Sequence, residues 1–338
     1  MSAGIPADAL VAPYDALLVD LDGVVFAGGK PIPGAAETLA TARAAEISVC
    51  FVTNNASRTP AQVAEHLQEM GAAATPDEVL TAAHAGVAVM SQSIPVPGPV
   101  LVVGADGLMQ AASDAGYHVV ETASENPVAV IQGFGRDVGW RHLAEAAFAI
   151  QQGAAFFATN VDTTLPQERG FAPGNGALVG AVEVATGVTP MSAGKPAPDM
   201  FHMAQKILGA TRPLAIGDRL DTDIRGARAA GIDSLHVLTG VSDAIAVAHA
   251  PVEDRPTYIA SDMTALMRPY PAIFTEETVT KAGAARAEVT ADVLHIRGEG
   301  IDAIRAGCVA TWDATDADGT QTVDTSALSG LGYVHGRA

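Results

Sequence analysis

Short runs of consecutive apolar residues alternate with longer segments in which apolar positions follow a helical period. The runs at 16–19, 47–52 and 213–216 are rich in Ala, Val, Leu and Ile, which is typical of buried strands. A helical pattern at 34–45 separates the first two runs. The order strand, helix, strand, helix predicts an α/β fold whose core is a doubly wound, Rossmann-like parallel sheet with right-handed crossovers.

Two predicted helix starts carry a capping pattern. Thr59 and Gln62, with a proline between them, form an N-cap followed by the glutamine of a capping box. Thr75 and Glu78 repeat this spacing, again with a proline between them. The repeat predicts that a third helix opens at 75–78.

The segment 86–189 interrupts this pattern and predicts a smaller α/β domain inserted into the first. Prolines and a glycine crowd its beginning, and two similar strand-helix-strand units follow at 100–120 and 128–158. The second of these units ends in the polar run 159–162. The glycine-rich run 173–176 predicts a loop at the edge of the insert.

The chain then returns to the first domain, and its last part differs in kind. The tail beyond Met267 is rich in Thr, Val, Asp and Gly, with short alternating runs at 287–296 and 308–311. We predict a discontinuous core domain at 1–85 and 190–267, an inserted α/β domain at 86–189, and a small mixed C-terminal appendage of unassigned role at 268–338.

Composition and charge restrict the classes of partner. The 338 residues carry a net charge of −19, which disfavours nucleic acids and anionic membranes because both would repel the chain. Cys50 and Cys308 are too few for a disulfide framework, so we expect a reducing, cytoplasmic environment. We find no apolar run of transmembrane length and no signal-peptide pattern, so we expect no membrane partner.

Polar and acidic side chains gather where the predicted strands end. Asp20 and Asp22 follow the first strand, and residues two apart in an extended chain point to the same side. Two carboxylates this close repel each other unless a cation or a proton offsets their charge. Thr53 and Asn54 follow the second strand, and Asp218 follows another. Open parallel sheets bind ligands at the edge where the carboxyl ends of their strands meet. The polar residues at these strand ends therefore predict a ligand site.

Other catalytic motifs do not fit the chain. It has no G-x-x-x-x-G-K-[ST] phosphate loop and no G-x-S-x-G nucleophile elbow, and its glycines at 174–180 have the wrong spacing for a dinucleotide site. His66 and His142 have no partner at metal-ligand spacing, which favours a surface or hydrogen-bonded role.

Four motifs, taken in order, resemble those of the haloacid dehalogenase superfamily of phosphatases. They are D-L-D-G-V-V at 20–25, V-T-N at 52–54, G-K-P at 194–196 and G-D-R-L-D-T-D at 217–223. The insert between the second and third motifs resembles the NagD-like subfamily, whose members carry an α/β cap of type 2. The resemblance covers about residues 14–267 and does not extend to the tail.

The resemblance implies a Mg²⁺-dependent phosphomonoesterase that works through an aspartyl phosphate. Asp20 would be the nucleophile, and Asp22 would be the general acid and base. Asp20, Asp218 and the backbone carbonyl of Asp22 would hold Mg²⁺, and this all-oxygen set suits that ion better than zinc.

The same resemblance implies a set of phosphate-binding residues. The Thr53 hydroxyl and the backbone amide of Asn54 would hold the phosphoryl oxygens, and Lys195 would neutralise charge shared between Asp20 and the phosphate. Asp223 would orient Lys195 or the water ligands of the metal.

The inserted domain is expected to close over the leaving group and to set specificity. Its candidate specificity residues are Asn160, Asp162 and Leu165. Pyridoxal phosphatases of this family tend to carry a histidine at the position of Leu165, so the leucine favours a small, non-aromatic phosphate ester.

We therefore expect a phosphatase that acts on glycerol 3-phosphate or phosphoglycolate. A nucleoside 5′-monophosphatase and a pyridoxal phosphatase stay as alternatives, and so does a non-catalytic sensor that binds phosphate esters. Similar proteins commonly dimerise through the cap, which makes a homodimer a further expectation.

Overall fold

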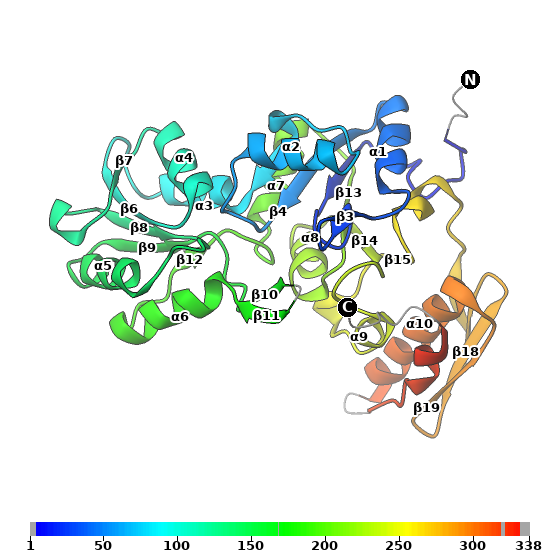
Figure 1. The fold of residues 1–338 in the computed structure, drawn as a ribbon. Coiled ribbons are helices and arrows are strands. Elements are labelled where there is room, and N and C mark those ends of the chain that lie inside the picture. Colours follow the sequence, from blue (N-terminus) through cyan, green and yellow to red (C-terminus); the bar gives the residue numbers. More distant parts are fainter. Residues whose placement is uncertain (1–4, 168, 319–321, 332–338) are drawn as a thin grey trace. The chain divides into compact units, whose positions relative to one another are not determined.

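The structure is a computed structural model that describes residues 5–167, 169–318 and 322–331 (Figure 1). By compactness the chain divides into two units, the first made of Met1–Val49 and Ala210–Ala338 and the second of Cys50–Gly209. The boundaries of these two units come from how the chain packs. The domain boundaries predicted above come from sequence motifs, and they stay a prediction. Each unit contains its own parallel strands.

The first unit contains parallel strands that are buried on both faces. Leu17 and Leu214 are fully buried, as expected for strands covered by helices on both sides. The strands are β1 (Ala16–Val19), β13 (Pro213–Gly217), β14 (Asp233–Val237) and β15 (Tyr258–Ala260), in the order β15-β14-β13-β1. The other elements here are β2 (Phe26–Ala27), β3 (Lys30–Pro31), α1 (Ala35–Ala44), the π-helical turn Leu220–Ile224, α8 (Arg225–Ala229), α9 (Ala244–Ala248) and the 3₁₀ turns Val252–Asp254 and Met263–Met267.

The register of β1 and β13 brings two acidic residues to one edge of this sheet. Val19 lies opposite Ile216, and the amide of Asp20 donates to the Ile216 carbonyl at 2.9 Å. Asp20 therefore leaves β1 next to the point where Asp218 follows β13. This is the carboxyl edge of the strands, where open α/β sheets bind ligands.

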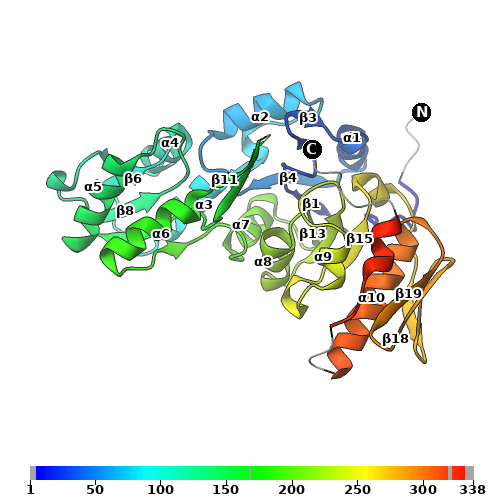
Figure 2. The same ribbon diagram turned by 60° about the horizontal axis from the view of Figure 1, so that its bottom comes forward.

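The C-terminal module, residues 273–318 and 322–331, is an antiparallel sheet covered by one long helix (Figure 2). Its hairpin at 287–296 agrees with the alternating pattern there, but the alternating run 308–311 is helical. Cys308 and Ala310 are both buried although residues two apart lie on nearly opposite sides of a helix, so the helix packs on more than one side here. The elements are β16 (Ile273–Glu276), β17 (Val279–Ala282), β18 (Ala285–Thr290), β19 (Val293–Arg297), α10 (Gly300–Asp318) and the 3₁₀ helix Ser326–Leu331.

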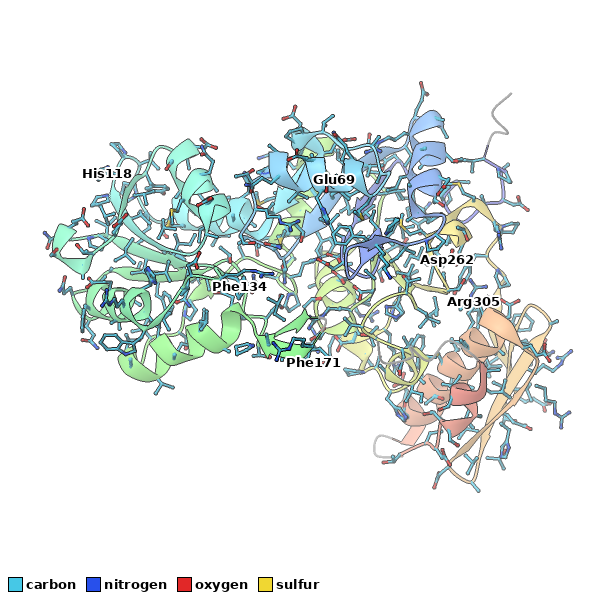
Figure 3. The ribbon with its side chains drawn as sticks, in the orientation of Figure 1. Glu69, His118, Phe134, Phe171, Asp262 and Arg305 are labelled. Carbon is cyan, nitrogen blue, oxygen red and sulfur yellow. The ribbon has the colours of Figure 1, made fainter. Side chains whose placement is uncertain are left out.

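The C-terminal module shares a hydrophobic core with the parallel-sheet part of its unit. Ile304 of α10 belongs to the same buried cluster as Leu220 and Ile224. Polar contacts join the two parts as well, because Trp312 Nε1 donates to the Val247 carbonyl at 2.9 Å. Arg305, labelled in Figure 3, donates from Nε to the Ile259 carbonyl at 2.8 Å. The tail is thus built into the first unit.

Strand β4 (Ser48–Thr53) continues into the second unit, where its residues Phe51 to Thr53 pair in parallel with β5 (Val79–Thr81). Helix α2 (Pro60–Glu69) begins after Thr59 as predicted. The Thr59 amide donates to Gln62 Oε1 at 2.9 Å, and the Gln62 amide donates to Thr59 Oγ1 at 3.3 Å. The first predicted capping box is confirmed.

The second capping box is present but opens no long helix. The Thr75 amide donates to Glu78 Oε2 at 2.8 Å, yet only the 3₁₀ turn Pro76–Glu78 follows. The chain then forms β5, and α3 (Ala82–Ser91) begins after it. The prediction of a helix at 75–78 was wrong because β5 is fully buried and pairs with β4, and this pairing overrides a local start signal.

A further parallel sheet forms from the middle of the chain, as the two strand-helix-strand units predict. Phe156 and Phe157 are buried in it and belong to its core. Its strands are β6 (Pro99–Val103), β7 (His118–Val120), β8 (Ala129–Gln132), β9 (Ala155–Ala158) and β12 (Met191–Ser192), in the order β12-β9-β8-β6-β7. The accompanying elements are α4 (Asp106–Asp114), the 3₁₀ turn Ala123–Glu125, α5 (Trp140–Gln151), β10 (Thr164–Gln167), β11 (Gly170–Pro173), α6 (Asn175–Thr186) and α7 (Asp199–Leu208).

The run 173–176, predicted as a loop, is the junction between β11 and α6. A Cβ at Gly174 or Gly176 would overlap backbone carbonyl atoms of residues 161–164. These two glycines therefore allow the start of α6 to approach the segment after β9 closely. The loop prediction was wrong because these glycines serve close packing between two adjoining elements and not a longer connection.

Candidate active site

Three carboxylates meet at the carboxyl edge of β1 and β13. One oxygen from each of Asp20, Asp218 and Asp223 lies within 4.8 Å of the others, and among the described residues this is the group that could hold a metal ion. Asp218 and Asp223 are buried, and Asp20 is partly exposed. The sequence predicted the first two residues as metal ligands, and the structure adds Asp223 to the same cluster.

Backbone amides of nearby residues fix the two buried carboxylates. The Val241 amide donates to Asp218 Oδ2 at 2.6 Å, and the Arg219 amide donates to Asp223 Oδ2 at 3.1 Å. Close approach of the main chain requires a glycine here, since a Cβ at Gly240 would overlap the Asp218 carboxylate. Both side chains are therefore held in place with little rotational freedom.

The donor set of this cluster fits Mg²⁺. Even at the 4.8 Å limit two carboxylates repel by about 3 kcal/mol at an effective dielectric near 20, and a bound cation would offset this charge. An octahedral Mg²⁺ with ligands at about 2.1 Å holds its oxygens roughly 3–4 Å apart, which agrees with three oxygens that lie within 4.8 Å of one another. All three ligands are hard oxygens, as this ion prefers.

Asp22 lies outside the carboxylate cluster. Its side chain is exposed, and its backbone forms a bridge with Phe26. The metal contact expected from Asp22 is made by its backbone carbonyl and not by its side chain. The exposed side chain therefore does not test this contact, which stays a prediction. Arg219 and Asp221, from the fourth motif, pair with each other at 3.0 Å, and the Asp221 side chain is 58% exposed.

Lys195 is buried in the second unit beside the end of β4. Only 3% of it is exposed, and its Nζ donates to the Val52 carbonyl at 3.0 Å. Its backbone is bound by the side chain of Asn54, at 2.8 Å for the Lys195 amide and 3.0 Å for the Lys195 carbonyl. Thr53, also buried, accepts from the Asn55 amide at 3.1 Å. The structure thus brings the second and third motifs together.

Two of the three predicted specificity residues contact Asn54. Asn160 Nδ2 donates to the Asn54 carbonyl at 2.8 Å, and Asn54 Nδ2 donates to Asp162 Oδ2 at 3.1 Å. Leu165 lies in the hairpin of β10 and β11, opposite Ala172, and is partly buried. Phe171 of this hairpin, labelled in Figure 3, is 73% exposed.

Sequence reasoning missed the role of two asparagine side chains. It used only the backbone amide of Asn54, and it placed Asn175 in a loop. Asn175 is 2% exposed at the start of α6, and its Nδ2 donates to the Asn160 carbonyl at 2.7 Å. The polar pair Asn54-Asn55 after a buried strand was a signal, but its partner lies 141 residues away and no local pattern points to it.

A cavity of about 780 Å³ lies elsewhere in the second unit, at the carboxyl ends of β6 and β8. It contains none of the predicted site residues. His66 and His142 line it, and Glu69, labelled in Figure 3, lies there too and pairs with His66 at 3.4 Å. Arginines and acidic residues are mixed along its walls, so its charge favours no single class of ligand.

The two cysteines are excluded as nucleophiles. Both are free and buried, and burial raises the pKa of the Cys50 thiol to about 12. Burial raises the pKa of the Cys308 thiol as well. Each thiol is therefore protonated at neutral pH and behaves as a small apolar side chain, as predicted for Cys50.

The parallel core and the carboxylate cluster define a metal-dependent hydrolase of the α/β class. A family model for haloacid dehalogenase-like hydrolases matches residues 17–118, and a HAD-hydrolase-like model matches residues 192–266. A D-glycerol 3-phosphate phosphatase from Mycobacterium tuberculosis is 41% identical over 315 residues, which cover 90% of this chain and 88% of that protein. The chain belongs to the haloacid dehalogenase-like hydrolases and is a phosphatase, as the motifs predicted.

Solved structures agree with this assignment. Glycerol phosphate phosphatase from Mycobacterium tuberculosis, in complex with magnesium, matches with a TM-score of 0.82 at 39% identity, over 90% of this chain and 92% of that chain. An acid sugar phosphatase from Staphylococcus epidermidis is 40% identical over 231 residues, which cover 68% of this chain and 88% of that protein. The predicted fold class and the Mg²⁺ cofactor are confirmed. Within the described residues, no helix has the length and apolar character needed to cross a membrane.

Proposed function

We propose that this chain hydrolyses D-glycerol 3-phosphate to glycerol and inorganic phosphate. The observation that carries the proposal is the 41% identity to a D-glycerol 3-phosphate phosphatase over 90% of the chain. The carboxylate cluster of Asp20, Asp218 and Asp223 supports the Mg²⁺-dependent chemistry. Phosphoglycolate, the other small ester expected from the sequence, is the nearest competitor.

In the first step an oxygen of the Asp20 carboxylate attacks phosphorus. The bond between phosphorus and the ester oxygen breaks, and its electron pair goes to the leaving glycerol oxygen. Asp22, as a carboxylic acid, gives that oxygen its proton. The product is glycerol, and the phosphoryl group stays on Asp20 as an aspartyl phosphate.

In the second step water attacks the phosphorus of the aspartyl phosphate. Asp22 takes a proton from this water, and the bond between phosphorus and the Asp20 oxygen breaks. Inorganic phosphate leaves, and both residues return to their starting protonation states. Splitting the reaction in this way lets one carboxyl group serve as acid and then as base.

The remaining residues hold the phosphoryl group. The Thr53 hydroxyl and the Asn54 amide donate to its oxygens, and the Lys195 ammonium neutralises part of its charge. Asp20 and Asp218, with the backbone carbonyl of Asp22, would hold Mg²⁺. When bound, Mg²⁺ offsets the charge of the carboxylates and of the phosphate. Asp223 lies close enough to Asp218 to orient the ligands of Mg²⁺ or to act as a further ligand.

The test is phosphate release from a panel of esters. D-glycerol 3-phosphate, phosphoglycolate, a sugar phosphate, pyridoxal phosphate and several nucleoside monophosphates are each assayed with Mg²⁺ and with EDTA. The proposal expects Mg²⁺-dependent release with the highest kcat/KM for D-glycerol 3-phosphate. A higher value for the sugar phosphate would instead follow the acid sugar phosphatase relative. Silence across the panel in a folded protein would favour a phosphate-ester sensor.

We also propose that the insert at 86–189 is the cap over the core at 1–85 and 190–267, and that Asn160, Asp162 and Leu165 belong to it. A homodimer through this cap is supported by exposed apolar residues on its helices, since Trp140 is 79% exposed and Val184 is 90% exposed. Light scattering that gives a monomer mass would refute the dimer. The two free cysteines support a cytoplasmic location.

A further inference from the structure

The side chain of Asn54 holds the backbone of Lys195 from two sides. Its Oδ1 accepts from the Lys195 amide at 2.8 Å, and its Nδ2 donates to the Lys195 carbonyl oxygen at 3.0 Å. One amide side chain thus pairs with both backbone groups of Lys195, much as a neighbouring strand would. The bonds join the end of β4 to the segment that follows β12.

Asp162 fixes the direction in which this amide points. The Asn54 Nδ2 atom carries two N–H groups and also donates to Asp162 Oδ2 at 3.1 Å. If the amide were turned over, its oxygen would face the carbonyl oxygen of Lys195 and the Asp162 carboxylate with no proton between them. The carboxylate therefore selects the orientation in which Asn54 can bind Lys195.

Asn160 secures the same junction through the main chain. Its Nδ2 donates to the Asn54 carbonyl at 2.8 Å, and its Oδ1 accepts from the Asp162 amide at 3.2 Å. Asn160 is 4% exposed and Lys195 is 3% exposed. Asn54 and Asp162 are partly buried, and breaking a hydrogen bond to a buried partner leaves that partner's polar group unpaired, which constrains the geometry of the junction.

We propose that Asn54, Asn160 and Asp162 are positioning residues that act through Lys195. The proposal rests on the proposed function, in which Lys195 binds the phosphoryl group. It assigns Asn160 and Asp162 a task other than the choice of leaving group expected from the sequence. Every phosphate ester presents the same phosphoryl group to Lys195, so loss of positioning affects all substrates alike.

The test compares two esters that differ only in their leaving group, D-glycerol 3-phosphate and p-nitrophenyl phosphate. Asn54→Ala and Asp162→Ala are each expected to lower kcat/KM about 10- to 100-fold, and by the same factor for both esters. Asp162→Asn keeps an oxygen that can accept the Asn54 N–H and is expected to retain kcat/KM within about threefold. In a Lys195→Met background, Asn54→Ala is expected to cost far less than in the wild-type protein.

Asn55→Ala is the matched control. Asn55 is exposed, and among the described residues its side chain accepts from Ser57 alone, at 2.8 Å from the amide and 2.7 Å from the hydroxyl. Hydrogen exchange gives a readout that needs no activity, because the Lys195 amide donates to Asn54. Asn54→Ala is expected to speed exchange in a peptide that contains Lys195, and Asn55→Ala is not. If Asn54→Ala does not fold, both kcat/KM for the two esters and hydrogen exchange at Lys195 are measured in Asp162→Ala.

A loss confined to D-glycerol 3-phosphate would overturn the proposal, since it would make these residues selectors of the leaving group. Unchanged kcat/KM for both esters in Asn54→Ala would overturn it too, and so would unchanged exchange at Lys195. If the wild-type protein hydrolyses neither ester, the proposed function fails, while the exchange experiment still tests the contact between Asn54 and Lys195.

Discussion

The carboxylate half of the proposed site, Asp20, Asp218 and Asp223, differs from the lysine half, Thr53, Asn54 and Lys195, in how its charges are held. Backbone amides of neighbouring residues fix the buried carboxylates, for instance Val241 for Asp218. One side-chain amide from a distant segment, that of Asn54, fixes the backbone of Lys195. The first half concentrates negative charge, and the second buries the ammonium group of Lys195, whose Nζ donates to the Val52 carbonyl at 3.0 Å.

This difference predicts different kinds of failure. Removing one carboxylate changes the charge that a cation must offset, so the damage should appear as lost chemistry or as a raised Mg²⁺ requirement. Removing one amide from the lysine half changes geometry and not charge, so the damage should be graded and independent of Mg²⁺.

Asp20→Asn should have the largest effect. An amide cannot attack phosphorus to form the intermediate, so we expect kcat to fall by at least about 10³-fold, equivalent to about 4 kcal/mol in the barrier. Phosphate release at saturating Mg²⁺ measures this. Asp221→Asn is the matched control, since Asp221 carries the same charge in the fourth motif but is 58% exposed and paired with Arg219. Substantial turnover in Asp20→Asn would point to direct attack by water.

Ile304→Ala should show that the carboxylate half depends on the C-terminal module. Ile304 is fully buried in the cluster that contains Leu220 and Ile224, the first and last residues of the turn that carries Asp223. We expect the free energy of unfolding to fall by about 2–5 kcal/mol. Ile207→Ala, at a site that is 57% exposed on α7, should cost less than about 0.5 kcal/mol. Equal losses in denaturant unfolding would contradict a shared core.

Asp223→Asn should weaken Mg²⁺ binding more than chemistry. The residue sits in the carboxylate cluster, and outer partners of a metal site typically change affinity by about 10- to 100-fold. We expect the Mg²⁺ concentration for half-maximal activity to rise by that factor, with kcat near the wild-type value at saturating Mg²⁺. A titration with Mg²⁺ checks this against Asp221→Asn. An irrecoverable loss of kcat would place Asp223 in the chemical step.

The positions of Asp20 and Asp218 in the carboxylate half were predictable from the sequence. Asp20 and Asp218 each follow a buried apolar strand, and parallel strands end at a common edge, so their meeting follows from topology. The contact between Asn54 and Lys195 was not predictable, because two asparagine bonds that span 141 residues leave no periodic trace. Thr75 shows the opposite failure, in which a correct local signal was overridden by the pairing of β5 with β4.

Leu165→His should have the smallest effect of the four. Leu165 is partly buried in the hairpin of β10 and β11, outside the hydrogen bonds that hold Lys195, so the substitution should leave the phosphoryl chemistry intact. A single contact to a leaving group changes discrimination by about 1–3 kcal/mol at most. We expect the ratio of kcat/KM between pyridoxal phosphate and D-glycerol 3-phosphate to rise several-fold, while turnover of p-nitrophenyl phosphate changes little. If that ratio stays constant, Leu165 does not contact the leaving group, and specificity must come from other residues of the insert.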